Sequence, residues 1–405
     1  MEPRDMLAGK RILLGVCGSI AAYKAVDLLR RLSERGAEVH VVLTRNAGRF
    51  VPPLTFETLS GRPVLYDEFE DRNAAAIGHI EFTDNLDLAL LAPATANVIG
   101  KIAAGIADDA LTSSLMALRC PLLIAPAMNE RMYCNPVLQR NIRTLKELGA
   151  RFIEPGTGSL ACGVVGQGRL ADIDRILAEA ASALSPRDLA GRTVLITAGP
   201  TREFIDAVRF ISNPSTGKMG YALAVAARDR GADVILISGP TQLAPPQGVK
   251  LIPVVSALQM RDAVVEQAGR SQVVIMAAAV SDFRPAQASD RKIKKDEAPA
   301  AVQLERTDDI LLALGKAGGG RLLVGFAAET DEVEQNAVKK LRNKNLDLIV
   351  ANDLRKIGSG FGSDTNAVTI IDRPGNRTEL PAMPKAAVAA HILDAVARLL
   401  KEKAG

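Results

Sequence analysis

The sequence predicts an α/β protein made of two doubly wound, Rossmann-like domains, each built on a mostly parallel sheet. Three observations support this prediction. Short runs of β-branched and aliphatic residues alternate with longer helical stretches, as in parallel sheets. Hydrophobic residues make up 48% of the chain, but only 3% of residues are aromatic, so Ala, Val, Leu and Ile must fill the cores. The length of 405 residues suits two or three domains of roughly 150 residues each.

The first half alternates strands and helices and ends with a closing helix at 171–184. Its expected strands are 11–16, 38–43, 86–92 and 121–125. Its other expected helices are 20–35, 110–118 and 136–148. A short polar link follows at 185–191, so we place the boundary near residue 188, between domains 1–188 and 189–405.

The second half repeats this alternation. Its expected strands are 193–197, 234–238, 250–255, 273–277, 322–326, 346–351 and 367–372. Its expected helices are 221–230, 257–268, 331–343 and 384–403. The insert at 282–301 is charged and contains proline, which predicts a mobile loop or flap outside the core.

The composition argues against several classes of protein. A formal net charge of +4 is small for this length and disfavours a nucleic-acid binder. The four cysteines form no CxxC pair and have no His at metal-ligand spacing, which disfavours a disulfide framework or a zinc site. The first ten residues lack the apolar core of a signal peptide, and no run approaches the ~18 apolar residues of a membrane span. We therefore expect a soluble cytoplasmic protein.

The loop at 199–220 is the strongest functional signal in the second half. Its end, R-F-I-S-N-P-S-T-G-K-M-G, joins a buried strand to an alanine-rich helix. Such loops hold phosphorylated ligands, because backbone N–H groups and the helix dipole favour an anion. It is not a Walker A loop, since Met follows the Gly-Lys pair. Arg209 and Lys218 could pair with phosphates, and Asn213 could hydrogen-bond an intermediate.

A similar opening follows the first strand, at G-V-C-G-S-I-A-A-Y-K (15–24). Gly18 permits a tight turn, and the Ser19 hydroxyl and the following amides can face a phosphate. The motif is not the GxGxxG of dinucleotide-binding proteins. Taken alone, it fits an ordinary strand-to-helix turn about as well as a binding loop.

Polar loops also follow three other strands of the first half. Thr44 ends the second strand, and A-P-A-T-A-N (92–97) and P-A-M-N-E-R-M (126–132) end two later ones. The carboxyl ends of parallel strands share one edge of a sheet, where such folds bind ligands. Asn97 and Asn129 could recognise carbonyl and amide groups of a flat cofactor.

His79 and Cys162 are the candidate acid–base groups of this half. A lone His such as His79 is usually structural, and we expect His40 and His391 to be structural or surface residues. Cys162 lies in the glycine-rich stretch 158–169. A buried, inert Cys is the default interpretation, but a mobile glycine loop needs no small hydrophobe, so a proton-donating or nucleophilic thiol is plausible.

Together and in this order, the motifs of the first half resemble the flavin-dependent cysteine decarboxylases, specifically the phosphopantothenoylcysteine decarboxylases. They are G-S-I-A-A-Y-K, the His79 segment, A-P-A-T-A-N, P-A-M-N-x-x-M and A-C-G-x-x-G-x-G-R, and the resemblance covers most of 8–185. It implies a flavodoxin-like domain that binds FMN. The implied cofactor contacts are Gly18, Ser19, Ile20, Thr44, Pro93, Thr95 and Asn97.

The resemblance also implies a reaction. FMN oxidises the substrate's cysteine thiol to a thioaldehyde, CO₂ is lost, and the reduced flavin returns the electrons to the enethiol. His79 matches the active-site His, Asn129 the Asn that binds the substrate carboxylate, and Cys162 the acid that protonates the product. Trimers, or assemblies of trimers, with active sites between subunits are implied as well. Tyr133 stands where this family commonly has Trp.

The second half carries further polar strand ends. In M-A-A-A-V-S-D-F (276–283), small residues such as Ala278 let a base or sugar approach the backbone, and Asp282 could hold Mg²⁺ or a ribose or be a solvated turn residue. In R-K-I-K-K (291–295), Lys292 and Lys294 share one face, although such runs are usually solvated. Lys340 and Lys344, at helical i,i+4 spacing, could neutralise phosphates.

This set resembles the phosphopantothenate–cysteine ligases, over about 190–400. The resemblance implies that CTP, with Mg²⁺, activates a carboxylate as an acyl-cytidylate that the cysteine amine then attacks. Asn213 matches the residue that supports formation of this intermediate, Arg209 a substrate contact, and Lys292 the lysine needed for its conversion. The implied nucleotide and substrate contacts are Lys218, Ala278, Asp282, Asp309, Ile310, Phe326, Lys340 and Lys344, with Asp282 as the metal ligand. Pro200, where the family commonly has Gly, and Thr216, where it has Ser, depart mildly from the family pattern.

The two resemblances together imply a bifunctional enzyme of coenzyme A biosynthesis. It would join 4′-phosphopantothenate to cysteine and then decarboxylate the product to 4′-phosphopantetheine. We also expect a homo-oligomer with a dimeric ligase domain. Two alternatives stay open: a flavoprotein that decarboxylates a peptide's C-terminal Cys, and a non-catalytic FMN-binding regulatory relative.

Overall fold

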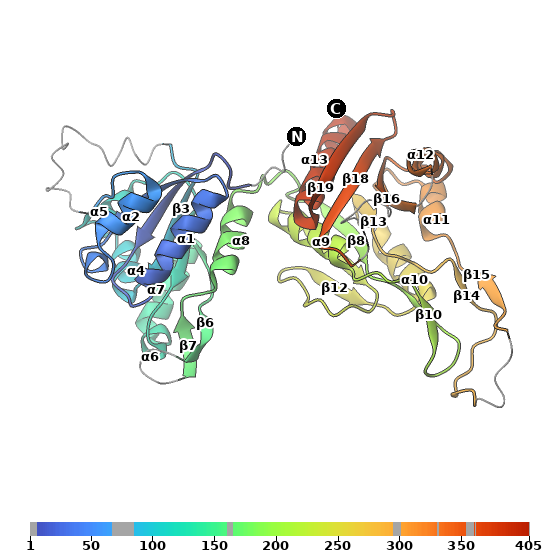
Figure 1. Cartoon of the computed structure of the whole chain (residues 1–405), viewed down its shortest axis with the longest axis horizontal. Helices are drawn as coiled ribbons and strands as arrows, with labels where there is room; N and C mark the ends of the chain where they lie inside the picture. The colour runs from blue at the N-terminus through green and yellow to red at the C-terminus, as the bar shows by residue number, and fades with distance from the viewer. Residues whose placement is uncertain are drawn as a thin grey trace. The chain divides into compact units, whose positions relative to one another are not determined.

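The computed structural model describes residues 6–66, 85–159, 165–294, 301–329, 332–353, 360 and 362–404 (Figure 1). The chain folds into two compact units, and the boundary between them falls between Ser185 and Pro186. Each unit has its own sheet and its own hydrophobic cores. Among the described residues, no helix is long and apolar enough to cross a membrane.

The N-terminal unit is built on a five-stranded parallel sheet of order β2-β1-β3-β4-β5. This is the flavodoxin-like order, so the predicted fold is confirmed. The winding reverses between β1 and β3, which opens a crevice at the carboxyl ends of these strands. The strands are β1 (Arg11–Val16), β2 (Glu38–Leu43), β3 (Leu88–Ala94), β4 (Leu122–Pro126) and β5 (Arg151–Phe152).

Helices cover both faces of this sheet because each presents one apolar stripe. Leu28 and Leu32 of α1 pack with Ile176 of α8 in one core, and Val98, Leu111 and residues of α7 pack in the other. The helices are α1 (Ala22–Glu34), α2 (Pro53–Ser60), α4 (Ala96–Ala103), α5 (Ala110–Met116), α6 (Glu130–Tyr133), α7 (Pro136–Glu147) and α8 (Ile173–Ala183), with a 3₁₀ turn η1 (Ala47–Arg49). An antiparallel ribbon, β6 (Gly156–Ser159) and β7 (Val165–Arg169), stands apart from the sheet.

The C-terminal unit contains an eight-stranded sheet of order β12-β11-β8-β13-β16-β17-β18-β19. Its first six strands are parallel and follow the doubly wound Rossmann pattern, with the winding reversed between β8 and β13. The last two strands pair antiparallel. The strands are β8 (Thr193–Ala198), β11 (Asp233–Ser238), β12 (Lys250–Pro253), β13 (Val273–Met276), β16 (Leu322–Glu329), β17 (Leu348–Asp353), β18 (Thr365–Asp372) and β19 (Arg377–Pro384).

Two helices cover one face of this sheet and three cover the other. Residues of α9 and α13 pack in one core, and residues of α10, α11 and α12 pack in the opposite core. The helices are α9 (Lys218–Asp229), α10 (Ala257–Ala268), α11 (Ile310–Ala317), α12 (Val333–Asn343) and α13 (Lys385–Ala404).

Two short antiparallel ribbons extend from this unit: β9 (Arg202–Phe204) with β10 (Phe210–Ser212), and β14 (Phe283–Pro285) with β15 (Leu304–Arg306). The insert at 282–301, expected to be a loop or flap outside the core, begins with β14, which pairs with β15 in one of these ribbons. Residues 295–300 lie outside the described residues.

Candidate functional site

A cavity of about 670 Å³ opens at the carboxyl ends of the N-terminal strands. Its wall includes five of the predicted cofactor contacts: Gly18, Ser19, Thr44, Thr95 and Asn97. These residues come from the loops after β1 and β2 and from the start of α4 after β3, which meet at the point where the winding reverses.

Two predicted cofactor contacts do not line this cavity. The side chain of Ile20 is 63% exposed, on the first turn before α1. Pro93 is buried within β3, and its carbonyl accepts a hydrogen bond from the Cys17 N–H (3.2 Å). Pro93 therefore holds the turn after β1 through its backbone carbonyl and does not line the cavity. Burial raises the pKa of the Cys17 thiol to about 12, so this thiol is inert at neutral pH.

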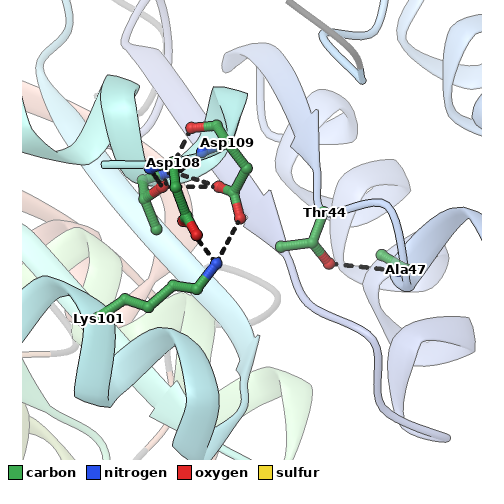
Figure 2. Close-up of polar contacts among 6 residues, drawn as sticks. Thr44, Ala47, Lys101, Asp108 and Asp109 are labelled. Carbon is green, nitrogen blue, oxygen red and sulfur yellow. Dashed lines mark hydrogen bonds and ion pairs between the residues drawn. The ribbon is translucent and has the colours of Figure 1, made fainter. Parts of the chain in front are cut away.

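The loop after β2 is held in place by Thr44. Its Oγ1 accepts a hydrogen bond from the Ala47 N–H at 3.3 Å (Figure 2), and its own N–H donates to the Val16 carbonyl at 3.1 Å. Asn46 then lies so close to Gly18 that a Cβ added to Gly18 would come within 2.9 Å of the Asn46 backbone carbon. Only glycine fits at this turn.

Sequence reasoning missed an ion cluster in the same wall. Figure 2 shows Lys101 of α4 pointing at Asp108 and Asp109, with Nζ–O distances of 2.6 and 3.3 Å. The hydrogen bond that Lys101 donates to Asp108 raises the pKa of Lys101. Burial tends to raise the pKa of Asp109, but hydrogen bonds from Thr112 and Lys101 outweigh it and lower that pKa. Asp109 also caps α5 by accepting from the Thr112 N–H (2.8 Å). One ammonium group therefore offsets part of the charge of two carboxylates beside the cavity.

Asn129 lies at the start of α6, directly after two residues that line the cavity, Ala127 and Met128. Its Oδ1 accepts a hydrogen bond from the Arg131 N–H at 2.8 Å. The ribbon β6–β7 is tied to the same loop, since the Met128 N–H donates to the Gly168 carbonyl at 2.9 Å. The predicted catalytic residues His79 and Cys162 lie outside the described residues.

The C-terminal unit has a second cavity, of about 600 Å³, at the carboxyl ends of its parallel strands. Nine predicted residues line it: Asn213, Lys218, Ala278, Asp282, Asp309, Ile310, Phe326, Lys340 and Lys344. They come from separate stretches of the sequence, so the fold brings together groups that the motifs could only suggest.

Hydrogen bonds hold several of these side chains in place. The Asn213 amide donates to the carbonyls of Ala279 and Val280, at 3.1 and 3.2 Å. Asp309 caps α11 and pairs with Lys344 at 2.6 Å. Burial tends to raise the pKa of Asp309, but the hydrogen bonds from Lys344 and the Leu312 N–H lower it overall.

Arg209 and Lys292 are not among the residues that line this cavity. The Arg209 guanidinium donates to the Ile293 carbonyl at 3.1 Å, which places the two predicted residues beside each other. Asp206 anchors this arrangement by accepting from the N–H groups of Arg209 (2.7 Å) and Ile293 (3.3 Å). Lys292 itself is exposed.

Several cavity residues had no signal that we recognised in the sequence. They are Asn352 at the end of β17, Asn366 on β18 and Lys385 at the start of α13. A lysine at a helix N-terminus opposes the helix dipole. That conflict, in M-P-K-A-A-V, was the signal that could have identified Lys385.

Comparisons with known proteins agree with this division. Residues 1–185 match the Flavoprotein family, and residues 189–400 match the DNA/pantothenate metabolism flavoprotein C-terminal domain. The Coenzyme A biosynthesis bifunctional protein CoaBC of Bacillus subtilis is 51% identical over 98% of this chain and 99% of its own length. The protein of the same name from Vibrio cholerae is 46% identical over 96% and 98%.

Two solved structures are also similar to parts of the chain. The crystal structure of the C-terminal domain of a coenzyme A biosynthesis bifunctional protein shares 45% identity, covering 53% of this chain and 99% of that one, with a TM-score of 0.47. The FMN-dependent cysteine decarboxylase SpaF shares 33% identity over 44% of this chain and 97% of that one, with a TM-score of 0.39.

Proposed function

Because this chain belongs to the family of coenzyme A biosynthesis bifunctional proteins, we propose that it joins 4′-phosphopantothenate to cysteine with CTP and then decarboxylates the product. The proposal divides the work between domains 1–188 and 189–405. The observation that carries it is the pairing of near full-length relatives with two separate cavities, each lined by predicted site residues. A bifunctional enzyme is therefore favoured over a regulatory relative or a peptidyl-cysteine decarboxylase.

The N-terminal cavity fits FMN by its size and its donors. Hydroxyl groups of Ser19, Thr44 and Thr95 and the amide of Asn97 line it, and these groups suit a phosphate and the polar edge of a flavin ring. When bound there, FMN would supply the two-electron oxidation and reduction that thiol-assisted decarboxylation needs. In this proposal Asn129 holds the substrate carboxylate, His79 acts at the active site and Cys162 protonates the product.

The C-terminal cavity fits a nucleoside triphosphate with Mg²⁺. Lys218, Lys340 and Lys344 would offset phosphate charge, and Asn213, whose amide donates to the Ala279 carbonyl, would support an acyl-cytidylate. Asp282 is a suitable metal ligand, because Mg²⁺ is often held by one or two carboxylates together with substrate phosphates. Arg209 and Lys292 would act from the adjoining ribbon, Lys292 on the conversion of the intermediate.

A homo-oligomer remains part of the proposal, with a dimeric ligase domain and trimers of the N-terminal domain. Four large apolar side chains are exposed on the ribbons of the C-terminal unit: Phe204, Phe210, Phe283 and Leu304, each 39–49% exposed. Exposed apolar groups gathered on one feature are typical of protein contacts. We propose that a second copy covers them, and that the protein acts in the cytoplasm.

Mass spectrometry of a reaction with purified protein, 4′-phosphopantothenate, cysteine, CTP and Mg²⁺ tests both activities. We expect 4′-phosphopantetheine together with CMP and pyrophosphate. Accumulation of phosphopantothenoylcysteine alone would leave the ligase and contradict the flavin half. If CTP is not consumed, the ligase assignment fails.

Two variants separate the halves of the reaction. Cys162→Ser should stop decarboxylation after the oxidation and leave ligase turnover intact. Lys292→Gln should do the reverse, and the acyl-cytidylate should accumulate. Full output of 4′-phosphopantetheine from either variant would refute the role given to that residue.

A further inference from the structure

We propose that Lys385 and Lys218 form one anion subsite in the C-terminal cavity, and that this subsite binds the terminal phosphates of the nucleotide. The inference rests on the proposed ligase function, and it adds Lys385 and Asn366 to the residues that serve it. Four observations carry it: the N-termini of α9 and α13 lie at the same cavity, Lys385 is buried, the amide oxygen of Asn366 has no hydrogen-bond partner among the described residues, and positive charge is in excess.

The two lysines are brought together by the layer of helices over one sheet face. Lys218 is the first residue of α9 and Lys385 the first of α13, and the two helices pack against each other. Both lysines line the cavity. The positive ends of two helix dipoles therefore face the same space as two ammonium groups.

The burial and the helix position of Lys385 are both unfavourable for the stability of the fold without a ligand. Its side chain is only 7% exposed, it stands in the first turn of a helix, and its Nζ donates to the Ser363 carbonyl. Burial lowers the pKa of Lys385, and nearby Lys218 lowers it further, while Asp364 opposes both. Asp364 also pairs with Lys218, at 2.6 Å. An anionic ligand would relieve the repulsion that the fold tolerates here.

Asn366 provides an independent sign of a ligand. It is 4% exposed and lines the cavity, yet its Oδ1 has no hydrogen-bond partner among the described residues. Asn366 lies opposite Met383 in the β18–β19 ladder, Lys385 begins α13 directly after β19, and both residues line the cavity. Buried amides are normally hydrogen-bonded, and an amide offers both donors and an acceptor to a phosphate and its bound water.

The charge favours phosphates over a single carboxylate. Even with the Asp364 carboxylate beside Lys218, two ammonium groups and two helix N-termini leave more positive charge than the single carboxylate of an amino acid would need. In the ligase reaction, a substrate carboxylate oxygen attacks the α-phosphorus, the bridging P–O bond to the β-phosphate breaks, and its electron pair leaves with pyrophosphate. Cations that hold the β- and γ-phosphates would stabilise this developing charge.

The test compares inorganic pyrophosphate, CTP and CMP binding to the full-length protein by calorimetry, with KM values from pyrophosphate release. Lys385→Met should weaken pyrophosphate and CTP binding by about tenfold to a hundredfold, the loss expected for one charge-assisted contact. CMP binding and the KM for cysteine should stay within about twofold of wild type. Lys385→Arg should restore most of the pyrophosphate affinity. Lys401→Met, an exposed lysine of the same helix, is the matched control.

Asn366→Asp keeps the side-chain shape and tests the subsite if Lys385→Met folds poorly. The added negative charge should weaken pyrophosphate binding and leave CMP binding unchanged. An unchanged pyrophosphate affinity in both variants overturns the proposal. A rise in the KM for cysteine alone overturns it in favour of an amino-acid carboxylate subsite, and an equal loss of CMP binding shows a merely structural role. If the wild-type protein releases no pyrophosphate from CTP, the proposed ligase function fails instead.

Discussion

Replacing Gly18 with Ala should damage flavin binding without touching the ligase. An added Cβ would lie 2.9 Å from the Asn46 backbone carbon and 3.2 Å from its α-carbon. Carbon atoms normally approach to about 3.5–4.0 Å, so the loops after β1 and β2 must separate by nearly 1 Å. Overpacking of this kind costs about 1–3 kcal/mol. If the whole of this cost destabilises the flavin-bound state, flavin affinity falls by roughly 5-fold to 150-fold.

Titration of the flavin-free protein with FMN, followed by quenching of flavin fluorescence, measures this loss. Gly100→Ala is the matched control, because a Cβ there would meet only the Asn141 Nδ2 at 3.7 Å and the residue lies in the interior of α4. CTP-dependent ligation by Gly18→Ala should match wild type, since Gly18 belongs to the other unit. Wild-type FMN affinity in Gly18→Ala would show that this turn does not position the cofactor.

Three other substitutions test the ion pairs. Lys101→Met removes the ammonium group between two carboxylates beside the N-terminal cavity, so FMN affinity should fall about tenfold. The control variant Lys146→Met should bind FMN as wild type does. Equal FMN affinities in the two variants would show that the cluster does not belong to the site. Asp309→Asn breaks the pair with Lys344 and should lower the free energy of unfolding by about 0.5–1 kcal/mol at neutral pH. Because the folded-state pKa of Asp309 is lowered, this difference should vanish as the pH falls through that pKa, and a difference that persists in acid would contradict the assignment. Arg230 is 5% exposed, and Arg230→Met removes a guanidinium that pairs with Asp188 and Asp394. The urea midpoint of the C-terminal unit should therefore fall by the equivalent of about 2–4 kcal/mol. An unchanged midpoint would show that these ion pairs add nothing to stability.

Hydrophobic runs were enough to predict the central strands and many helices. The predicted bounds of β1, β2 and α10 coincide with those observed, because the two strands are short, largely buried runs and α10 starts directly after its capping Ser256. The helix α4 was missed because its start, in A-P-A-T-A-N, resembles a polar loop. The strand β19 was missed because it contains two prolines, which an edge strand tolerates and an inner strand does not.

The candidate sites were predictable where a motif held the residues and not where the fold assembled them. The loop that contains Lys218 can be recognised from its own sequence motif. Nine predicted residues line the C-terminal cavity. Lys385 and Asn366 depend on the antiparallel pairing of β18 with β19, which no local pattern revealed. Lys101 was missed for another reason: its partners lie seven and eight residues along the chain, beyond the end of α4, so they do not show the i,i+4 spacing of a helical ion pair.

The helix α13 has a consequence for how the protein is made. It follows every other element of its unit in the sequence, yet its Val388, Ile392 and Val396 pack in the same core as Val194 of the first strand, β8. A growing chain can complete the N-terminal unit long before this helix leaves the ribosome. Until then α9 alone covers one apolar face of the C-terminal sheet, and the uncovered part is a hazard for aggregation and a surface that chaperones could bind. Since Lys385 begins α13, the proposed phosphate subsite would be completed only when synthesis of the unit is almost over.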